Sequence, residues 1–346
     1  MDFGIFTMFT VREDGTQSEA FKEWFGVVQA AEDLGLDTFW IGESHFRPER
    51  AVMAAPLIGA SAVAARTQRI KVGLAVQVLP LANPLRIAEE AAIVDHISEG
   101  RLVFGVGRSS FLESYHGYNI EYSESRGRFA ESLEIILKAW GDEPFSYEGE
   151  FYQFHDVNLV PKTYQRPHPP VRVAVESRDT FALIGSLGFP IFMRHQMEIP
   201  QLQELLHQYQ EARHLAGFDG PNDVILQIGA YVAETAEDAY SDPQASSMHR
   251  LRVVQRNLSQ VGDQETYERL KQSSQVTYDE LLPRLAFGTP EAVAEKIQWY
   301  REELGITGIS VDINPGGQIP HDKVMNSLRL FAEEVIPRFR SRGRVE

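Results

Sequence analysis

Eight short apolar segments, most of them followed by a stretch with helical spacing, constrain the fold of this chain more than any other feature. Continuous apolar runs of this length are typical of strands buried on both faces, as in a parallel sheet covered by helices. The expected strands are Asp2–Phe9, Thr38–Gly42, Ile70–Leu79, Leu102–Val106, Val171–Val175, Pro190–Met193, Val224–Val232 and Ile306–Ile313. The pattern predicts an α/β fold, most simply a single (β/α)8 TIM barrel that forms one domain over residues 1–346.

Two segments depart from this alternation and predict insertions after the fourth and seventh strands. Phe145–Asp156 alternates aromatic residues around a central Glu148–Gly149, which predicts a β-hairpin. Asp238–Pro283 is polar and has no strand pattern, so it is either helical or a mobile loop, and functional lids belong to this class. A doubly wound open sheet is the alternative fold, but it usually carries a G-x-G-x-x-G turn after its first strand, and none is present.

Composition narrows the class of function. The chain has 33 Lys and Arg against 49 Asp and Glu, so its formal charge of −16 argues against partners such as nucleic acids or anionic membranes. The absence of cysteine excludes disulfides, thiolate nucleophiles and iron–sulfur clusters. The N-terminus lacks the pattern of a signal peptide, and no apolar run is long enough to span a membrane. We therefore expect a soluble cytoplasmic protein.

Polar residues at the end of the fourth strand suggest an anion site. Arg108 follows a glycine and precedes Ser109, and the carboxyl ends of barrel strands carry the functional site. Arg126 begins a helix, where backbone amides favour anions, so the two arginines could hold one phosphate from two sides. Ser177 and Thr180 begin the helix after the fifth strand and could donate to the same anion. Helix capping alone would also explain these two hydroxyls, and Arg108 could be a surface residue.

Glu43 and His45 follow the second strand and lie two residues apart. If the strand geometry persists, both side chains face the same side. A histidine oriented by a carboxylate can act as a general base, although a purely structural pair is the alternative. No third ligand can be placed beside this pair, so no metal site is predicted.

Aromatic residues are frequent in the loops at the same predicted rim. They are Phe9, Phe46, Phe111, Tyr115 and Tyr118. They could pack beneath the loops, or they could form an apolar pocket for a flat ring system. The chain has neither a G-x-x-x-x-G-K-[ST] phosphate loop nor a G-x-S-x-G elbow, which argues against nucleotide hydrolysis and serine-esterase chemistry.

Four longer motifs carry a family resemblance. They are Asp37–Phe46 (DTFWIGESHF), Val72–Pro84 (VGLAVQVLPLANP), Ala88–Arg108 (AEEAAIVDHISEGRLVFGVGR) and Val171–Thr180 (VRVAVESRDT). Through them the chain resembles the bacterial luciferase-like flavin monooxygenases along essentially its whole length. The resemblance implies a (β/α)8 barrel that uses FMN or, in some branches, the deazaflavin F420. Typical members take reduced FMN from a separate reductase and use it with O₂ to oxidise aldehydes, ketones or other substrates.

The resemblance also implies roles for individual residues. The implied cofactor-binding residues are Arg108 and Arg126 at the flavin phosphate, Glu176, Ser177 and Thr180 at the phosphate and ribityl chain, and Ala75 and Val76 at the flavin ring. We expect Ser109, beside Arg108, to contact the same phosphate. The family has a non-proline cis peptide at the position of Ala75–Val76. It also favours a homodimer.

Three departures from the family pattern affect the expected reaction. Ser44 replaces the histidine that is regarded as the catalytic base, while His45 is retained. Gly107 stands where luciferase has a reactive-site cysteine, and Arg194 and His195 replace an expected serine and tryptophan. Ser44 and Gly107 argue against light-emitting aldehyde oxidation and leave other oxygenations open, including oxygen insertion of the Baeyer–Villiger type. Arg194 and His195 predict a different pocket wall near the flavin.

The sequence therefore predicts a two-component monooxygenase that uses reduced FMN and O₂ to oxygenate a small apolar organic molecule, such as an aldehyde or ketone. The catalytic residues would be His45 and Glu43. Its expected partners are this substrate and a separate flavin reductase. The alternatives are an F420-dependent oxidoreductase on the same barrel and a non-catalytic, flavin-binding partner subunit.

Overall fold

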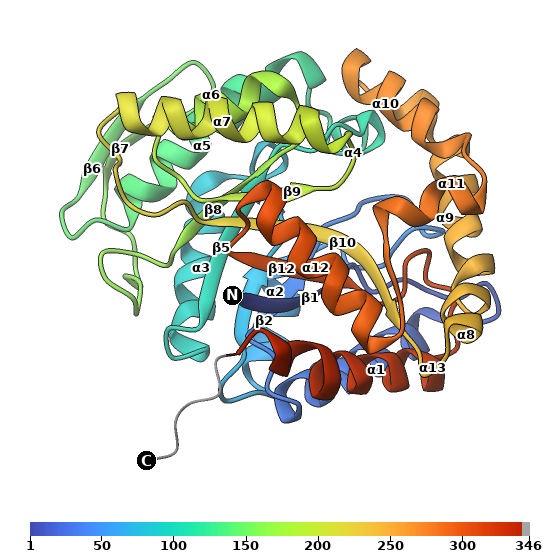
Figure 1. The fold of residues 1–346 in the computed structure, drawn as a ribbon. Helices are drawn as coiled ribbons and strands as arrows, with labels where there is room; N and C mark the ends of the chain where they lie inside the picture. Colours follow the sequence, from blue (N-terminus) through green and yellow to red (C-terminus); the bar gives the residue numbers. More distant parts are fainter. Residues whose placement is uncertain (341–346) are drawn as a thin grey trace.

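The computed structural model describes residues 1–340 and contains a closed parallel barrel (Figure 1). The barrel strands are β1 (Asp2–Thr7), β2 (Thr38–Ile41), β3 (Lys71–Leu74), β5 (Leu102–Gly107), β8 (Val171–Val175), β9 (Ile191–Arg194), β10 (Val224–Val232) and β12 (Gly308–Asp312). Each strand pairs in parallel with the next, and β12 closes the barrel by pairing with β1. The predicted α/β class and (β/α)8 barrel are therefore confirmed.

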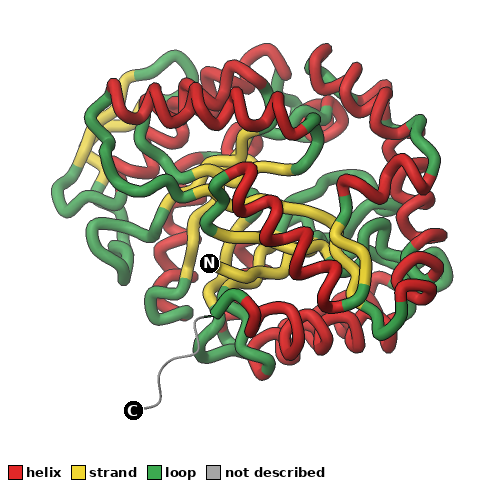
Figure 2. Tube along the Cα trace, viewed as in Figure 1, coloured by secondary structure: helices red, strands yellow, loops and turns green. Residues whose placement is uncertain are grey.

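Helices surround the strands on the outside of the barrel (Figure 2). The helices that follow the barrel strands are α1 (Gln17–Asp33), α2 (Pro56–Ala64), α3 (Pro84–Ile97), α5 (Ser125–Ala139), α6 (Arg178–Ser186), α7 (Ile199–Leu215), α12 (Pro290–Leu304) and α13 (His321–Leu330). Local sequence fixes their ends. Thr16 and Glu19 form a capping box at the start of α1, and Gly305 ends α12 with a left-handed φ of 60°. No helix within residues 1–340 is long and apolar enough to cross a membrane.

Further elements lie between the barrel strands. They are α4 (Leu112–Gly117) and the antiparallel hairpin β6 (Phe145–Glu148) and β7 (Gln153–Val157) after β5, and α8 (Ala236–Ser241), α9 (Gln244–Arg256), α10 (Gln264–Ser274), α11 (Tyr278–Leu281) and the short strand β11 (Ala286–Gly288) after β10. The predicted hairpin is confirmed. Of the two alternatives for Asp238–Pro283, the structure has the helical one, and these helices stand together along one side of the barrel (Figure 1).

The third predicted strand is wrong in its length. Ile70–Leu79 divides into β3 and a separate short strand, β4 (Gln77–Val78), both of which pair with β5. The register explains the break. Gly73 pairs with Val103 and Gln77 pairs with Val106, so the β3–β4 segment has one residue more than β5 has over the same stretch. An extra residue of this kind forms a bulge that interrupts the ladder.

Four apolar side chains fill the inside of the barrel below the site. Phe6, Trp40, Phe192 and Ile225 form a cluster of their own, and the rings of Trp40 and Phe192 lie 5.1 Å apart. Because β2 and β9 are not neighbours in the sheet, these two rings meet across the barrel interior. Gly73 makes room for the indole, since a Cβ atom there would lie 2.3 Å from it. This cluster gives the barrel an apolar floor.

Candidate active site

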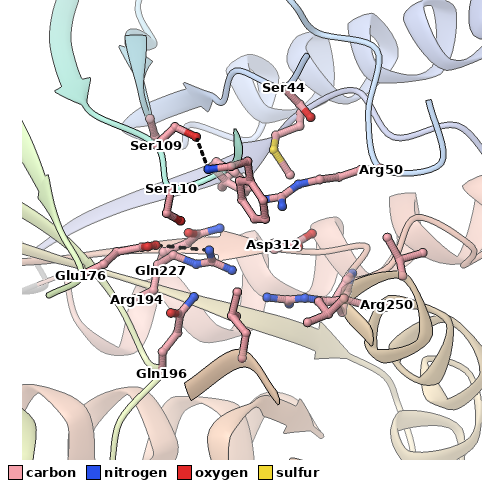
Figure 3. A pocket seen from close by; sticks show the side chains of 18 of the residues that line it. Ser44, Arg50, Ser109, Ser110, Glu176, Arg194, Gln196, Gln227, Arg250 and Asp312 are labelled. Atoms are coloured by element: carbon pink, nitrogen blue, oxygen red, sulfur yellow. Dashed lines mark hydrogen bonds and ion pairs between the residues drawn. The ribbon is translucent and has the colours of Figure 1, made fainter. Parts of the chain in front are cut away.

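A cavity of about 370 Å³ opens at the carboxyl ends of the barrel strands (Figure 3). Residues that follow several different strands line it, as is general for barrels of this type. Of the predicted site residues, those in its lining are Glu43, His45, Ala75, Val76, Arg108, Ser109, Glu176, Ser177 and Thr180. Arg126 is the predicted site residue that does not line the cavity. Phe6 and Phe192 of the barrel floor close it from below.

Glu43 and His45 form a buried pair in the cavity wall. Nε2 of His45 lies 2.6 Å from Oε1 of Glu43, and the two side chains are 5% and 3% exposed, respectively. The other carboxylate oxygen of Glu43 accepts from the amide of Gln77 at 3.0 Å and from the backbone N–H of Val78 at 2.8 Å. Burial raises the pKa of Glu43, and the hydrogen bond from His45 acts against that shift. The hydroxyl of Tyr118 lies 3.2 Å from Nδ1 of His45, so both ring nitrogens have partners.

Arg108 is held in place without a carboxylate partner. Its Nη1 donates to the hydroxyls of Tyr122 at 3.1 Å and Ser125 at 3.0 Å. Its backbone is also fixed, because the hydroxyl of Tyr115 donates to the carbonyl oxygen of Arg108. No carboxylate among residues 1–340 forms an ion pair with this guanidinium. A positive charge in a cavity wall with only neutral partners is suited to an anionic ligand.

Two hydroxyls lie at the start of α6, on the same cavity. Ser177 occupies the N-cap position, but its side chain makes no capping hydrogen bond. Its Oγ donates instead to Oγ1 of Thr180 at 3.3 Å, and the Thr180 hydroxyl donates to the carbonyl of Ser177 at 2.6 Å. Helix capping therefore does not account for the Ser177 hydroxyl.

Arg126 lies at the edge of the site rather than in its wall. Its Nη1 lies 2.6 Å from Oδ2 of Asp179, in the first turn of α6, and both side chains are more than half exposed. The structure therefore brings the start of α5, which carries Arg126, beside the start of α6. The arginine is paired within the chain, and its contact with a phosphate stays a prediction.

The peptide bond between Ala75 and Val76 is cis, as the family resemblance implies. Both residues line the cavity between β3 and β4. Val76 lies against Gly107, where an added Cβ would lie 2.5 Å from Cγ2 of Val76. The glycine that replaces the luciferase cysteine therefore leaves the space that Val76 occupies.

Of the two alternatives left open for the aromatic rim residues, the structure contradicts the apolar pocket for four of the five. Phe9 is fully buried and packs on Phe21 and Phe25 outside the cavity, because its backbone turns into a left-handed φ of 57°. Phe46 is 53% exposed. Of the five residues proposed, only Phe111 lines the cavity. The apolar lining comes from the barrel strands as well as from loops.

Several charged residues of the cavity were not predicted from the sequence. They are Arg47, Arg50, Arg250 and Arg284. Arg47 and Arg50 stand in the loop that follows the Glu43–His45 pair, so their nearness to that pair is a signal that the sequence contains. Arg250 comes from α9, and nothing in the local sequence indicates that this helix reaches the site.

The comparison with known protein families agrees with the fold. Residues 1–308 match the family model described as luciferase-like monooxygenase. The chain belongs to this family.

Named relatives align over nearly all of the chain. The chain is 25% identical to the alkanal monooxygenase alpha chain of the Kryptophanaron alfredi symbiont, over 97% of this chain and 98% of the relative. It is 26% identical to limonene 1,2-monooxygenase of Rhodococcus erythropolis, over 98% of this chain and 87% of the relative. Both relatives are named monooxygenases.

Solved structures share the fold. Monooxygenase RslO1 from Streptomyces bottropensis has a TM-score of 0.84 at 26% identity, and the match covers 98% of this chain and all of RslO1. The oxygenating constituent of 3,6-diketocamphane monooxygenase from Pseudomonas putida, in complex with FMN, has a TM-score of 0.83 at 20% identity, covering 97% and 98%. An F420-dependent secondary alcohol dehydrogenase has a TM-score of 0.77 at 16% identity, covering 98% and 99%.

Proposed function

We propose that this protein is the oxygenating component of a two-component monooxygenase that uses reduced FMN and O₂. One observation carries the proposal. A single cavity joins the anion-seeking Arg108 to the buried Glu43–His45 pair, with Ala75 and Val76 in the wall of the same cavity. The substrate would be a small organic molecule whose reacting part is apolar, because Phe6 and Phe192 form the floor of that cavity.

The residues present fit FMN. Arg108 lacks a carboxylate partner, and the hydroxyls of Ser109, Ser177 and Thr180 lie in the same lining, so these groups would hold the phosphate. Ala75 and Val76 would lie against the flavin ring, and Glu176 would face the ribityl chain. When bound, reduced FMN supplies the electrons that activate O₂.

The Glu43–His45 pair would control protons near the reacting atoms. An ionised Glu43 accepts the hydrogen on Nε2 of His45, which leaves Nδ1 as an acceptor for the Tyr118 hydroxyl. Tyr118 is 44% exposed, whereas His45 is buried at the cavity. These three groups therefore form a hydrogen-bonded path from solvent to the cavity, along which a proton can move to or from the site.

The test begins with an anaerobic titration of the protein with reduced FMN. The complex is then mixed with O₂ in the presence of a panel of aldehydes and ketones. Incorporation of one oxygen atom into an organic product, measured by mass spectrometry with ¹⁸O₂, supports the proposal. Binding of reduced FMN without product from any compound favours a non-catalytic flavin-binding subunit. Binding of F420 with hydride transfer, and no binding of FMN, would replace the proposal with the F420-dependent alternative.

We further propose that the protein acts in the cytoplasm as a homodimer supplied by a separate flavin reductase. Support for a homodimer comes from three exposed isoleucines on two helices that pack together. Ile58 on α2 is 71% exposed, and Ile93 and Ile97 on α3 are 46% and 42% exposed. Apolar side chains gathered on neighbouring helices mark an interaction surface. Light scattering of the wild type and of Ile58→Glu tests the homodimer, and a monomeric wild type would contradict it.

A further inference from the structure

Three arginines from separate parts of the chain converge inside the cavity (Figure 3). Arg50 comes from the loop after β2, Arg194 ends β9, and Arg250 lies on α9. We refer to these three residues as the arginine cluster. Their guanidinium groups point toward the same part of the cavity, and Gln227 and Asp312 lie beside them (Figure 3).

The positive charge of the arginine cluster has little compensation. Within residues 1–340, the side chains of Arg50 and Arg250 form no hydrogen bond and no ion pair. Arg194 lies 3.4 Å from a carboxylate oxygen of Glu176, but Glu176 also pairs with Arg269 at 3.8 Å. All three arginines are partly buried in the cavity wall, and partly desolvated charges without full partners are costly, so a site of this kind is suited to a ligand that completes it.

The electrostatics agree with this geometry. Burial lowers the pKa of Arg50 well below its usual value, and the positive charges of Arg47, Arg194 and Arg250 add to the effect. Burial also raises the pKa of Asp312, although Arg250 and Arg194 act in the opposite direction. A carboxylate that burial holds toward its neutral form is a weak counter-charge for two arginines.

The whole cavity is positive although the chain is acidic. Six arginines line it against four carboxylates, whereas the chain has a formal charge of −16. Two of those four carboxylates are already committed, because Glu43 accepts from His45 and Glu176 is shared by two arginines. A basic pocket in an acidic protein concentrates anionic ligands at that position.

The arginine cluster stands apart from the predicted phosphate site. Arg108 is fixed by Tyr122 and Ser125, on the side of the barrel formed by β5 and α5. The cluster is carried instead by the β2 loop, β9 and α9. The positive charges that act on Arg50 are those of Arg47, Arg194 and Arg250, and Arg108 is not among them. We therefore infer a second position for an anion, because a single flavin phosphate on Arg108 would leave the cluster without a partner.

We propose that the arginine cluster binds a carboxylate of the substrate, so that the substrate is an organic acid with an apolar body. The inference rests on the proposed monooxygenase function and specifies its substrate class. Planar guanidinium groups match a carboxylate through paired hydrogen bonds. The apolar body would extend from this end of the cavity over Phe6 and Phe192. Phe111, with Arg47 stacked 3.9 Å above its ring and Arg50 at 5.0 Å, would border the carboxylate position.

The test compares acids with their own methyl esters, because the two differ in charge and little else. Decanoate, 9-oxodecanoate and 2-naphthoate, each with its ester, are titrated into the protein with and without FMN, and the thermal midpoint is followed. At least one acid is expected to bind roughly ten-fold or more tightly than its ester, as for hydrogen bonds between charged groups. The preference should weaken at high salt. If no acid binds more tightly than its ester, the proposal is wrong.

Variants locate the binding position. Arg250→Gln and, separately, Arg50→Gln should abolish the preference for the acid and leave the affinity for FMN unchanged. Arg252→Gln is the matched control, because Arg252 lies on the same helix and is exposed. If Arg250→Gln and Arg50→Gln weaken FMN binding and keep the acid preference, the cluster binds the cofactor anion and the proposal is overturned.

These titrations do not depend on oxygenation. An acid preference without flavin binding would contradict the proposed function and leave the carboxylate site standing. Flavin binding with equal oxygenation of esters and acids would support the proposed function and contradict the carboxylate site.

Discussion

His45 and Glu43 are joined by a 2.6 Å contact between Nε2 and Oε1 in a wall of the cavity, and neither side chain is more than 5% exposed. The position of the Glu43 carboxylate is fixed, because the side-chain amide of Gln77 and the N–H of Val78 donate to its second oxygen. A buried carboxylate in this position fixes which ring nitrogen carries the hydrogen. An ionised Glu43 places the hydrogen on Nε2, which leaves Nδ1 to accept from the Tyr118 hydroxyl.

Glu43→Gln should lower the rate of oxygenation about 100-fold or more, within the usual range for a lost acid–base group. The amide keeps the shape of the side chain but removes the charge that orients His45. Binding of reduced FMN should be unchanged, because Arg108 and the hydroxyls at α6 remain. Glu211→Gln, at an exposed position, is the control. Equal turnover in the variant and the wild type would show that the pair is structural.

Arg108→Gln should weaken FMN binding by about ten-fold to 100-fold, as expected for the loss of charge-assisted hydrogen bonds. Riboflavin lacks the phosphate, so its affinity should not change. Arg128→Gln is the matched control, because Arg128 lies on the neighbouring helix α5 and is paired with Glu124 at 2.7 Å. Fluorescence titration with the two flavins measures the difference. A parallel loss of riboflavin affinity would place Arg108 away from the phosphate.

Asp179→Asn should increase the affinity for FMN by a few fold. The substitution removes a negative charge from the start of α6 and releases Arg126 from its 2.6 Å ion pair. The free energy of unfolding should change by less than about 1 kcal/mol, because the pair is largely exposed. The same two-flavin titration applies here. If FMN binds more weakly to the variant, Asp179 positions Arg126 for the phosphate rather than competing for it.

The spacing of apolar residues and the turn residues between segments were sufficient to predict the barrel. Parallel strands buried on both faces and amphipathic helices have distinct local patterns. The break in the third strand was not predictable from Ile70–Leu79 itself. It depends on a register mismatch with β5, which is a relationship between two segments. The short strand β11 was not predicted for a similar reason, since only its pairing with β10 defines it.

The residues of the candidate site also differ in whether the sequence alone could place them at the cavity. Glu43, His45 and Arg108 lie directly after strands, so the barrel topology alone places them at the cavity. Arg250 lies on α9, and its approach depends on how that helix packs over the strand ends. The segment that follows α9 is attached to the loop after β5 by a bridge between Phe111 and Val261 and by a hydrogen bond from the N–H of Gly262 to the carbonyl of Ser110 at 2.8 Å. Such long-range contacts have no signature in local sequence.

The stability of the protein should fall as the pH drops from about 6.5 to about 4, partly because of His195. Burial lowers the pKa of His195 to about 4, and Nδ1 of its ring lies 2.8 Å from the Tyr300 hydroxyl. Between these pH values the unfolded chain takes up a proton that the folded chain does not, which favours unfolding. The contribution is about 2 kcal/mol, allowing for partial solvent access.

Urea denaturation at several pH values measures this effect. His195→Gln should flatten the pH dependence between about pH 6.5 and about pH 4, the window set by the ordinary and lowered pKa values. His207→Gln, at an exposed position of α7, should leave it unchanged. An unchanged slope in His195→Gln would mean that other groups cause the acid sensitivity.

Two glycines of β5 should respond differently to alanine. A Cβ at Gly105 would lie 1.7 Å from the carbonyl oxygen of Leu74, so the backbone of the bulge has to move. A Cβ at Gly107 would have its one close contact with the side chain of Val76, at 2.5 Å, and no backbone atom among its three nearest neighbours. Because overpacking usually costs 1–3 kcal/mol and more when the backbone must move, we expect losses of about 3 kcal/mol for Gly105→Ala and about 1 kcal/mol for Gly107→Ala. Urea denaturation checks both values, and equal losses would contradict the close approach of Leu74.

Gly107→Ala should in addition weaken the binding of FMN and riboflavin alike, because it displaces Val76 from the place predicted to face the flavin ring.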